Sequence, residues 1–420
     1  ATWPRRAPCA GTPPSRAPEA TGGRAPDPRA PGRFLPGPAA MYRPISDYAL
    51  IGNRHTCALV SRDGSVDWCC LPHLDSPSVF AALRAARAGG RWRIAPAGEA
   101  AATRAYLGPS AVLRTEFRGA GGVLQLIDFL PIRAGASADR QSESSHCIVR
   151  HLRCVEGEVE ADVEWTPRPN YAREDVVLRR DGVVVFASSP NYELSLAGFP
   201  EHVPLALDGA SVRARVRLRA GEGFNLACAW GGADPNPVAW TAEHHLDDTL
   251  RWWEAWAGSC AVPDGVEEWR ELVLRSGMVL KLLTNETSGA IAAAPTTSLP
   301  EEIGGVRNWD YRFCWVRDSS MIARALLALG HDREARDFLD FLERAAAQHH
   351  DPARIQVMYG LRGETRLTEY TLGHLDGYRD SGPVRIGNAA ALQRQLDIYG
   401  EVLDAADELA RIGAPPGPER

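Results

Sequence analysis

Lysine is nearly absent from this sequence: Lys281 is the only one in 420 residues, and arginine supplies the remainder of the 47 basic side chains. Against 53 acidic residues this leaves a formal net charge of −6. So small an acidic excess gives no electrostatic attraction to nucleic acid or to an anionic membrane surface. We therefore expect neither as a partner, and the composition leaves the oligomeric state undetermined.

Long hydrophobic runs and paired cysteines are also missing. No apolar stretch reaches the roughly 18 residues that a membrane-spanning helix needs, and the N-terminal residues lack the apolar segment of a signal peptide. The nine cysteines include no Cys-x-x-Cys pair, which argues against a zinc site. Because an odd number of scattered cysteines fits reduced thiols, we predict a cytoplasmic protein.

No pattern predicts a cofactor or a metal. The glycine motifs that bind phosphates and dinucleotides are absent. Histidines occur in pairs at 244–245 and 349–350, and Asp351 follows the second pair. A solvated helix surface or helix end explains these histidines better than metal binding does. We expect no metal and no cofactor.

The chain divides into segments of different composition. Residues 1–40 are rich in proline and arginine and poor in large apolar residues, which predicts a disordered tail; a basic tail that binds a partner is the alternative. Residues 41–240 read as many short strands joined by turns. In 212–219 apolar residues alternate strictly with arginines, and Asp181-Gly182 suits a hairpin turn. These features favour an antiparallel β-sandwich domain.

After about residue 240 the apolar period becomes helical. We expect a linker helix within 241–262 and a helical domain over 263–420. Its helices are predicted at 266–284, 318–329, 332–348 and 388–412, with Asp318 and Ser319 as candidate caps at the start of the second and Gly330 after its end. The loops 285–316 and 350–387 are long, and long loops at one end of a helical scaffold usually carry the functional site.

The first of these loops ends in an unusual stretch, RNWDYRFCWVRDSS, at 307–320. In extended backbone the alternate residues Trp309, Tyr311, Phe313 and Trp315 would share one side. Arg312 and Arg317 would flank that side, with Asp310 and Asp318 nearby.

Such a surface suits a sugar, because a sugar ring has an apolar face and a rim of hydroxyls. Aromatic rings stack on that face, while arginine and aspartate side chains donate to and accept from neighbouring hydroxyls. Nucleic-acid bases also stack on aromatics, but the acidic net charge disfavours a polyanion. A purely structural alternative remains open, in which Asp318 is a helix cap and Trp309 and Trp315 are core anchors.

The stretch 307–320 resembles the signature near the start of the catalytic domain in glycoside hydrolase family 15, which contains glucoamylases and trehalase-like enzymes. Residues 45–83 resemble the trehalase-like N-terminal domain of bacterial members, and residues 355–405 resemble a further block of the family. The resemblance extends in order from about Tyr42 to Arg411. It implies an α+β multidomain protein, with an antiparallel β-sandwich followed by an (α/α)6 barrel.

The resemblance also implies an activity and a set of site residues. Family members hydrolyse α-glucosidic bonds with inversion, and their pocket holds the glucose at the non-reducing end of trehalose or of an α-glucan. Carried over, Arg317 and Asp318 would hold the hydroxyls of that glucose. The residues expected to shape the rest of the pocket are Trp309, Asp310, Tyr311 and Trp315. In the loop 376–388, Tyr378 and Arg385 are the best candidates for closing another part of its mouth; packing is the alternative role of that loop.

The sequence departs from the family pattern toward its C-terminus. The predicted helices make only part of a barrel, and the family's general acid and general base match nothing before Arg420. We therefore expect both catalytic carboxylates beyond Arg420. Loop carboxylates such as Glu301, Glu302, Glu364, Glu369 and Asp376 are not assigned to either role.

Two functional hypotheses follow. The first is an inverting α-glucosidase, whose preference between trehalose and maltooligosaccharides the sequence leaves undetermined. The second is an inactive truncated chain or a sugar-binding relic without the general acid and base. An incomplete barrel would leave apolar residues such as Leu392, Leu396 and Leu403 uncovered. An incomplete barrel without the general acid and base therefore predicts a poorly soluble chain that releases no glucose from trehalose or maltose.

Overall fold

The computed structural model describes residues 42–132, 146–262, 265, 267–349 and 354–412. Two predictions fall outside these residues: the disordered tail at 1–40 and the roles of His350 and Asp351. The described residues belong to one compact unit, Pro38–Arg420.

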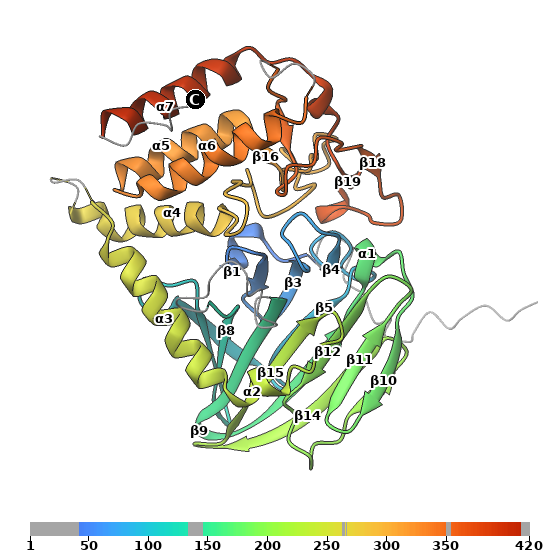
Figure 1. The fold of residues 1–420 in the computed structure, drawn as a ribbon. Coiled ribbons are helices and arrows are strands. Elements are labelled where there is room, and N and C mark those ends of the chain that lie inside the picture. Colours follow the sequence, from blue (N-terminus) through green and yellow to red (C-terminus); the bar gives the residue numbers. More distant parts are fainter. Residues whose placement is uncertain (1–41, 133–145, 263–264, 266, 350–353, 413–420) are drawn as a thin grey trace, which may run out of the picture. The chain divides into compact units, whose positions relative to one another are not determined.

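The N-terminal part of the described chain is a large antiparallel sheet (Figure 1). Its strands, in chain order, are β1 (Tyr48–Gly52), β2 (Cys57–Ser61), β3 (Ser65–Cys70), β4 (Ser78–Phe80), β5 (Arg91–Pro96), β6 (Ala100–Tyr106), β7 (Leu113–Gly119), β8 (Gly122–Phe129), β9 (Cys147–Thr166), β10 (Val177–Asp181), β11 (Val184–Ser188), β12 (Glu193–Ala197), β13 (Ala206–Asp208), β14 (Ser211–Arg219) and β15 (Gly223–Trp230). The long β9 pairs with β5 and β14 in one half of the sheet and with β8 and β15 in the other. A single hydrophobic cluster contains residues of both halves, among them Ile94, Leu126 and Leu196.

The period-2 patterns of the sequence become these strands. In β14 the four apolar residues from Val212 to Leu218 are buried, while the arginines between them are exposed. β10 and β11 form the predicted hairpin, with Asp181 opposite Val184 and with Gly182 at φ +58°. Alternating burial of this kind is expected where one face of a sheet packs on a core and the other faces water.

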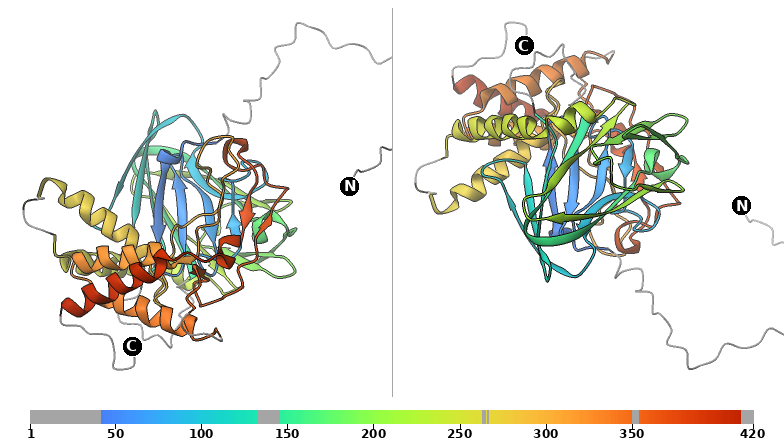
Figure 2. Two further views of the ribbon diagram at one scale, coloured as in Figure 1. Left: turned by 90° about the horizontal axis from the view of Figure 1, so that it is seen from above. Right: turned by 90° about the horizontal axis from the view of Figure 1, so that it is seen from below.

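Helices and short strands make up most of the C-terminal part. They are α2 (Asn236–Trp240), α3 (Ala242–Gly258), α4 (Arg270–Leu283), β16 (Cys314–Trp315), α5 (Val316–Ala328), α6 (Asp332–Ala346), β17 (Met358–Tyr359), β18 (Tyr370–Thr371), β19 (Arg385–Ile386) and α7 (Asp397–Arg411), and a short turn of helix within the sheet region is α1 (Pro169–Ala172). The views in Figures 1 and 2 agree that α5, α6 and α7 lie side by side. Within the described residues the helices close no barrel.

Two helix predictions need correction at their ends. The range 388–412 is not one helix, because a 3₁₀ turn over Ala389–Leu392 precedes α7 and four residues separate them. Asp318 and Ser319 are not caps, since α5 already begins at Val316 and no side chain caps it. The 3₁₀ turn over Ala389–Leu392 does have a side-chain cap: the side-chain oxygen of Asn388 accepts a hydrogen bond from the backbone N–H of Ala390.

The helical part packs directly against the sheet. One hydrophobic cluster combines Cys57, Leu74 and Ile132 with apolar residues of α3 to α7. The Trp68 ring N–H donates to the Pro295 carbonyl at 2.9 Å. The loop that carries β18 and β19 contributes to a further cluster with Tyr171 of α1. The long loops before α5 and before α7 are therefore held against the end of the sheet.

Two further findings concern the chemistry of the described residues. All eight described cysteines are buried and free of disulfides. No helix in the described ranges is both long and apolar enough to cross a membrane.

Candidate sugar-binding site

The stretch 307–320 runs as extended backbone into the first turn of α5. Asp310 forms a β-bridge with Thr297, and Cys314–Trp315 pairs with Met358–Tyr359 as β16 and β17. In this conformation Trp309, Tyr311 and Trp315 are all partly exposed. The Tyr311 and Trp315 ring centroids are 6.0 Å apart, with 41° between the ring planes. Three of the four predicted rings are thus available at the surface.

Phe313 and Arg312 do not join that surface, and the prediction for both is wrong. Phe313 is 7% exposed and packs with Val357, Met358 and Ala391. Arg312 is 1% exposed and forms hydrogen bonds inside the molecule.

Arg317 and Asp318 lie beside the rings in the first turn of α5. The Arg317 side chain is one-third exposed and its guanidinium lies 5.8 Å from the Trp315 ring. It contacts Asp318 at 3.4 Å and donates to Gln395 Oε1 and to Asp397 Oδ2, each at 3.1 Å. The hydrogen bond that Arg317 donates to the Asp397 carboxylate raises the pKa of Arg317 above its ordinary value. The guanidinium is therefore fixed as a charged donor next to an aromatic face.

Trp309 lies beside a second arginine of the predicted set. The Arg385 guanidinium is 4.4 Å from the Trp309 ring centroid, a distance at which a cation is attracted to the face of the ring. Arg385 also donates to the backbone oxygens of Val306 and Asn308 and lies 3.4 Å from Glu369. The structure thus joins the stretch 307–320 to the loop that contains residue 385.

Asp310 and Tyr378, predicted to shape the pocket, are buried. Asp310 is fully buried and pairs with Arg312 at 2.6 Å. Tyr378 is 2% exposed, and its hydroxyl donates to the Arg43 carbonyl at 2.9 Å. Neither side chain offers a free face to a ligand, and both hold loops together.

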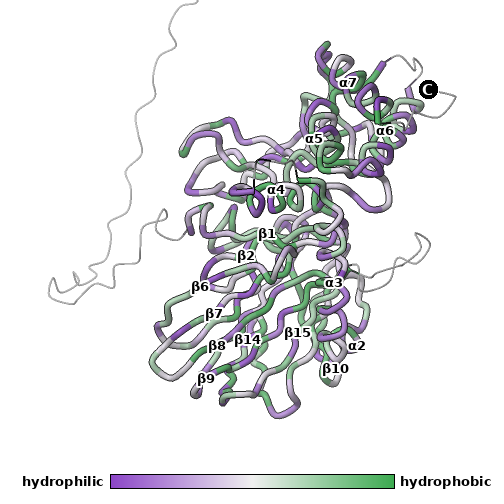
Figure 3. The backbone as a smooth tube through the Cα atoms, turned by 90° about the vertical axis from the view of Figure 1, so that its left-hand side faces the viewer, coloured by the Kyte–Doolittle hydropathy of each residue, from purple (hydrophilic) through white to green (hydrophobic). Residues whose placement is uncertain are grey.

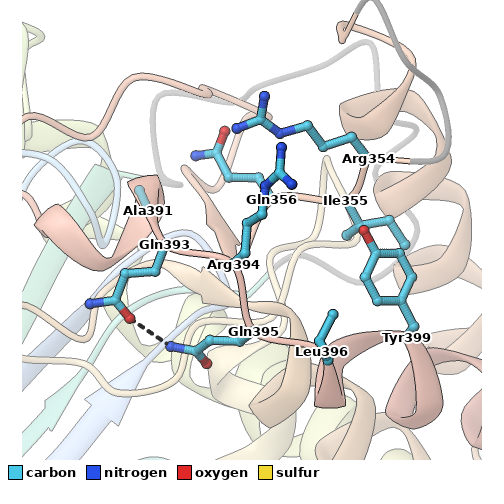
Figure 4. Close-up of a pocket in the computed structure, with 9 residues that line it drawn as sticks. All are labelled: Arg354, Ile355, Gln356, Ala391, Gln393, Arg394, Gln395, Leu396 and Tyr399. Carbon is cyan, nitrogen blue, oxygen red and sulfur yellow. Dashed lines mark hydrogen bonds between the residues drawn. The ribbon is translucent and has the colours of Figure 1, made fainter.

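A pocket of about 200 Å³ adjoins Arg317, and the sequence reasoning missed it (Figure 4). Gln395, which accepts from Arg317, lines it and donates to Gln393 at 3.0 Å. The remaining lining residues are Arg354, Ile355, Gln356, Ala391, Arg394, Leu396 and Tyr399. The amide-rich segment 393–395, immediately before α7, was the available signal. A lining of amide and guanidinium donors with apolar walls suits a small polar ligand.

Carboxylates in the neighbouring loops are mostly ion-paired. Glu369 lies next to Arg385, Asp397 next to Arg317, and Glu301 next to Arg307. These carboxylates are engaged in ion pairs, and none of them is assigned as a general acid or a general base.

The predicted histidine pairs have other neighbours. His244 contacts Asp248 on the same helix at 3.4 Å, and the His349 ring lies against the Tyr359 ring. In the described part of the chain no group of three or more His, Cys, Asp or Glu side chains is arranged to hold a metal ion.

Comparison with known families identifies two regions. Residues 267–412 match the family described as glycosyl hydrolases family 15, and residues 33–253 match the family described as trehalase-like, N-terminal. The second match alone spans more than half of the chain.

Curated relatives align with most of the chain. A trehalase of Mycolicibacterium smegmatis is 37% identical over 400 residues, which are 91% of this chain and 59% of the relative. A trehalase of Mycobacterium tuberculosis is 35% identical over 382 residues, 87% of this chain and 56% of the relative. A trehalase of Thermoplasma volcanium is 30% identical over 380 residues, 89% and 58% respectively. The chain thus spans somewhat less than three fifths of the length of these relatives.

Proposed function

We propose that the protein takes part in the inverting hydrolysis of α-glucosidic bonds, with trehalose as its substrate, because the chain belongs to the trehalase-like, N-terminal family and its residues 267–412 match glycosyl hydrolases family 15. The names of its relatives support this substrate. Inversion requires a general acid on one side of the sugar and a general base, which activates water, on the other. No residue of this chain is assigned to either role.

In this proposal the stretch 307–318 holds the glucose at the non-reducing end. The rings of Tyr311 and Trp315 stack on the apolar face of the sugar, and Arg317 and Asp318 bind its hydroxyls. Trp309 and Arg385 extend the same surface. The observation that supports it most strongly is the grouping of Trp315, Arg317 and Asp318 on one accessible surface beside a polar pocket.

Fold, domain boundaries and location are part of the same proposal. The sheet region forms a β-sandwich domain over 41–240, α3 lies in the linker at 241–262, and α4 to α7 form part of an (α/α)6 barrel within 263–420. The eight described cysteines are buried and none of them forms a disulfide, which supports a reducing, cytoplasmic location.

Substitution of Arg317 tests the sugar site. Arg317→Ala removes a charged donor from the surface, and we expect the Kd for trehalose and for methyl α-glucoside, measured by isothermal titration calorimetry, to rise at least about tenfold. Arg333→Ala, on the exposed side of α6, is the matched control and should leave both Kd values unchanged. Equal sugar binding by the Arg317 variant and the unaltered chain would contradict the proposed site.

A second candidate is a chain that binds sugar without hydrolysing it. It is favoured by the ion pairs that engage Glu301, Glu369 and Asp397. Glucose release from trehalose, maltose and isomaltose by the purified chain separates the two. Release supports the hydrolase, and its relative rates identify the substrate. Saturable binding without release supports the binding protein.

A further inference from the structure

Arg312 connects the sheet region to the stretch that carries the proposed sugar site. Its guanidinium pairs with Asp310 and donates to the Ser76 carbonyl at 2.7 Å and to the Tyr171 hydroxyl at 2.8 Å. Ser76 and Tyr171 both belong to the sheet region. Because the side chain is 1% exposed, these partners replace water, and losing one of them leaves part of a buried charge without compensation.

Tyr171 reaches Arg312 from an unfavourable backbone conformation. Asn170, Tyr171 and Ala172 all lie in the left-handed region, with φ of 53°, 59° and 59°. Residues with a side chain rarely adopt this region, and three in succession persist only where the surroundings fix them. The Tyr171 carbonyl is also within 2.7 Å of His374 Nε2, so the turn is held from two sides.

In extended backbone, neighbouring side chains point to opposite sides, so fixing the buried side of the stretch also fixes the side that carries the exposed rings. Asp310 and Arg312 point inward, and Trp309 and Tyr311 therefore point outward. Asp310 is fixed a second time, because Gly387 N–H donates to its carboxylate at 3.2 Å and the Asn388 side chain donates to its carbonyl at 3.1 Å. The inward pair thus sets the direction in which the neighbouring rings leave the backbone.

We infer that Tyr171 is a positioning residue for the sugar site, which acts through Arg312 to fix the stretch 309–315 from the sheet region. Its hydroxyl contacts Arg312 and lies on the opposite side of the stretch from the exposed rings. The inference rests on the proposed function, and it gives the sheet region a direct part in sugar binding.

Tyr171→Phe tests the inference, because it removes only the hydroxyl. The matched control is Tyr106→Phe, since among the described residues the Tyr106 hydroxyl hydrogen-bonds to the backbone of Leu50 within the sheet region. Two quantities are measured for both variants and the unaltered chain: hydrogen exchange of the backbone amides of 308–316, and the Kd for methyl α-glucoside. Thermal unfolding gives the stability lost in each variant.

In Tyr171→Phe we expect faster amide exchange at 308–316 and a Kd raised about fivefold to tenfold. In Tyr106→Phe we expect a similar loss of Tm, with the exchange rates and the Kd unchanged. A residue with only a structural role would lower Tm without changing the Kd relative to the control. Unchanged exchange at 308–316 would overturn the positioning role. If the unaltered chain binds no sugar, the proposed function fails, and the inference survives only as an anchoring role seen in the exchange data.

Discussion

Ala172 holds a backbone conformation that suits glycine. At φ 59° a Cβ atom crowds the following carbonyl, which costs roughly 1–2 kcal/mol for residues other than glycine. We predict that Ala172→Gly stabilises the protein by about 0.5–1 kcal/mol, after the larger entropy of the unfolded glycine chain is subtracted. Urea unfolding measures the change. Ala214→Gly in the ordinary strand β14 should destabilise, and a loss of stability in both variants would contradict the prediction.

His146 links stability to pH at the end of the sheet. Its ring lies 5.7 Å from that of His55 and 5.6 Å from that of His73. Burial, followed by repulsion from the two neighbouring imidazoles, lowers its pKa from 6.5 to about 4. The unfolded chain therefore binds the proton more tightly than the folded one, so this site destabilises the fold as the pH falls from 6.5 to 4.

His146→Phe should reduce that acid sensitivity. Phenylalanine keeps a ring between His55 and His73 but cannot take up a proton. We expect the free energy of unfolding, measured with urea at pH 7 and pH 4.5, to fall less between these values than in the unaltered chain. The exposed His202 gives the control variant, His202→Phe. A variant of His146 that is as acid-sensitive as the unaltered chain would refute the assignment.

Single residues also mark the limit of what the sequence predicts about the site. Alternation correctly places Trp309, Tyr311 and Trp315 at the surface of an extended stretch. It places Arg312 on the opposite side of the stretch from the rings, but it does not show that this side is buried while Arg317 stays partly exposed. The difference depends on Tyr171 and Ser76, which are distant in the chain and enclose Arg312. Burial of a charged residue therefore requires knowledge of the tertiary contacts.

Among the helices, α7 is held to the rest of the molecule both by a buried apolar face and by ion pairs to α5. Ile398, Ala405 and Leu409 bury one face of α7 in the helical core, and Figure 3 shows hydrophilic and hydrophobic residues in turn along it. Arg324 of α5 lies within 4 Å of Glu401, Asp404 and Glu408 on α7. One arginine thus serves three carboxylates that would otherwise repel one another.

We predict that Arg324→Met loosens α7. Repulsion among the three carboxylates is no longer compensated, so the amides of 398–410 should exchange with solvent several-fold faster, while those of α6 keep their rates. High salt should reduce the difference, because the charges are partly exposed and screened. Arg336→Met, which removes a pair within α6, is the control. Unchanged exchange in α7 would show that its apolar face alone holds it.

Element types followed from the sequence where periodicity was long and regular. The alternating strand β14, the hairpin of β10 and β11, and the amphipathic α6 all formed as predicted. The prediction of one helix over 388–412 was wrong because the leucines keep a helical spacing across residues 393–396, which are not helical. Spacing does not report the backbone hydrogen bonds that end a helix, and here the side chain of Asn388 starts a separate 3₁₀ turn.

For the molecule as a whole, the most unusual feature is uncovered apolar surface before and along α7. Leu392, Leu396 and Leu403 are 85%, 83% and 68% exposed. Neighbouring apolar side chains at this exposure favour association, because contact removes them from water. Their exposure agrees with the sequence expectation, although Leu392 ends the 3₁₀ turn, Leu396 lies between that turn and α7, and Leu403 alone lies within α7.

We therefore predict that the purified chain self-associates. Its weight-average sedimentation coefficient should rise with concentration, and the double substitution Leu396→Gln and Leu403→Gln should shift this rise to at least about tenfold higher concentration, since roughly 1.5–3 kcal/mol of contact is lost for each leucine that association buries fully. Leu272→Gln removes a leucine that is 59% exposed on α4 and controls for a general gain in polarity. If all three proteins sediment identically at every concentration, the exposed leucines are not the contact surface. If only the double variant stays monomeric, the surface formed by residues 392–403 is the contact between chains.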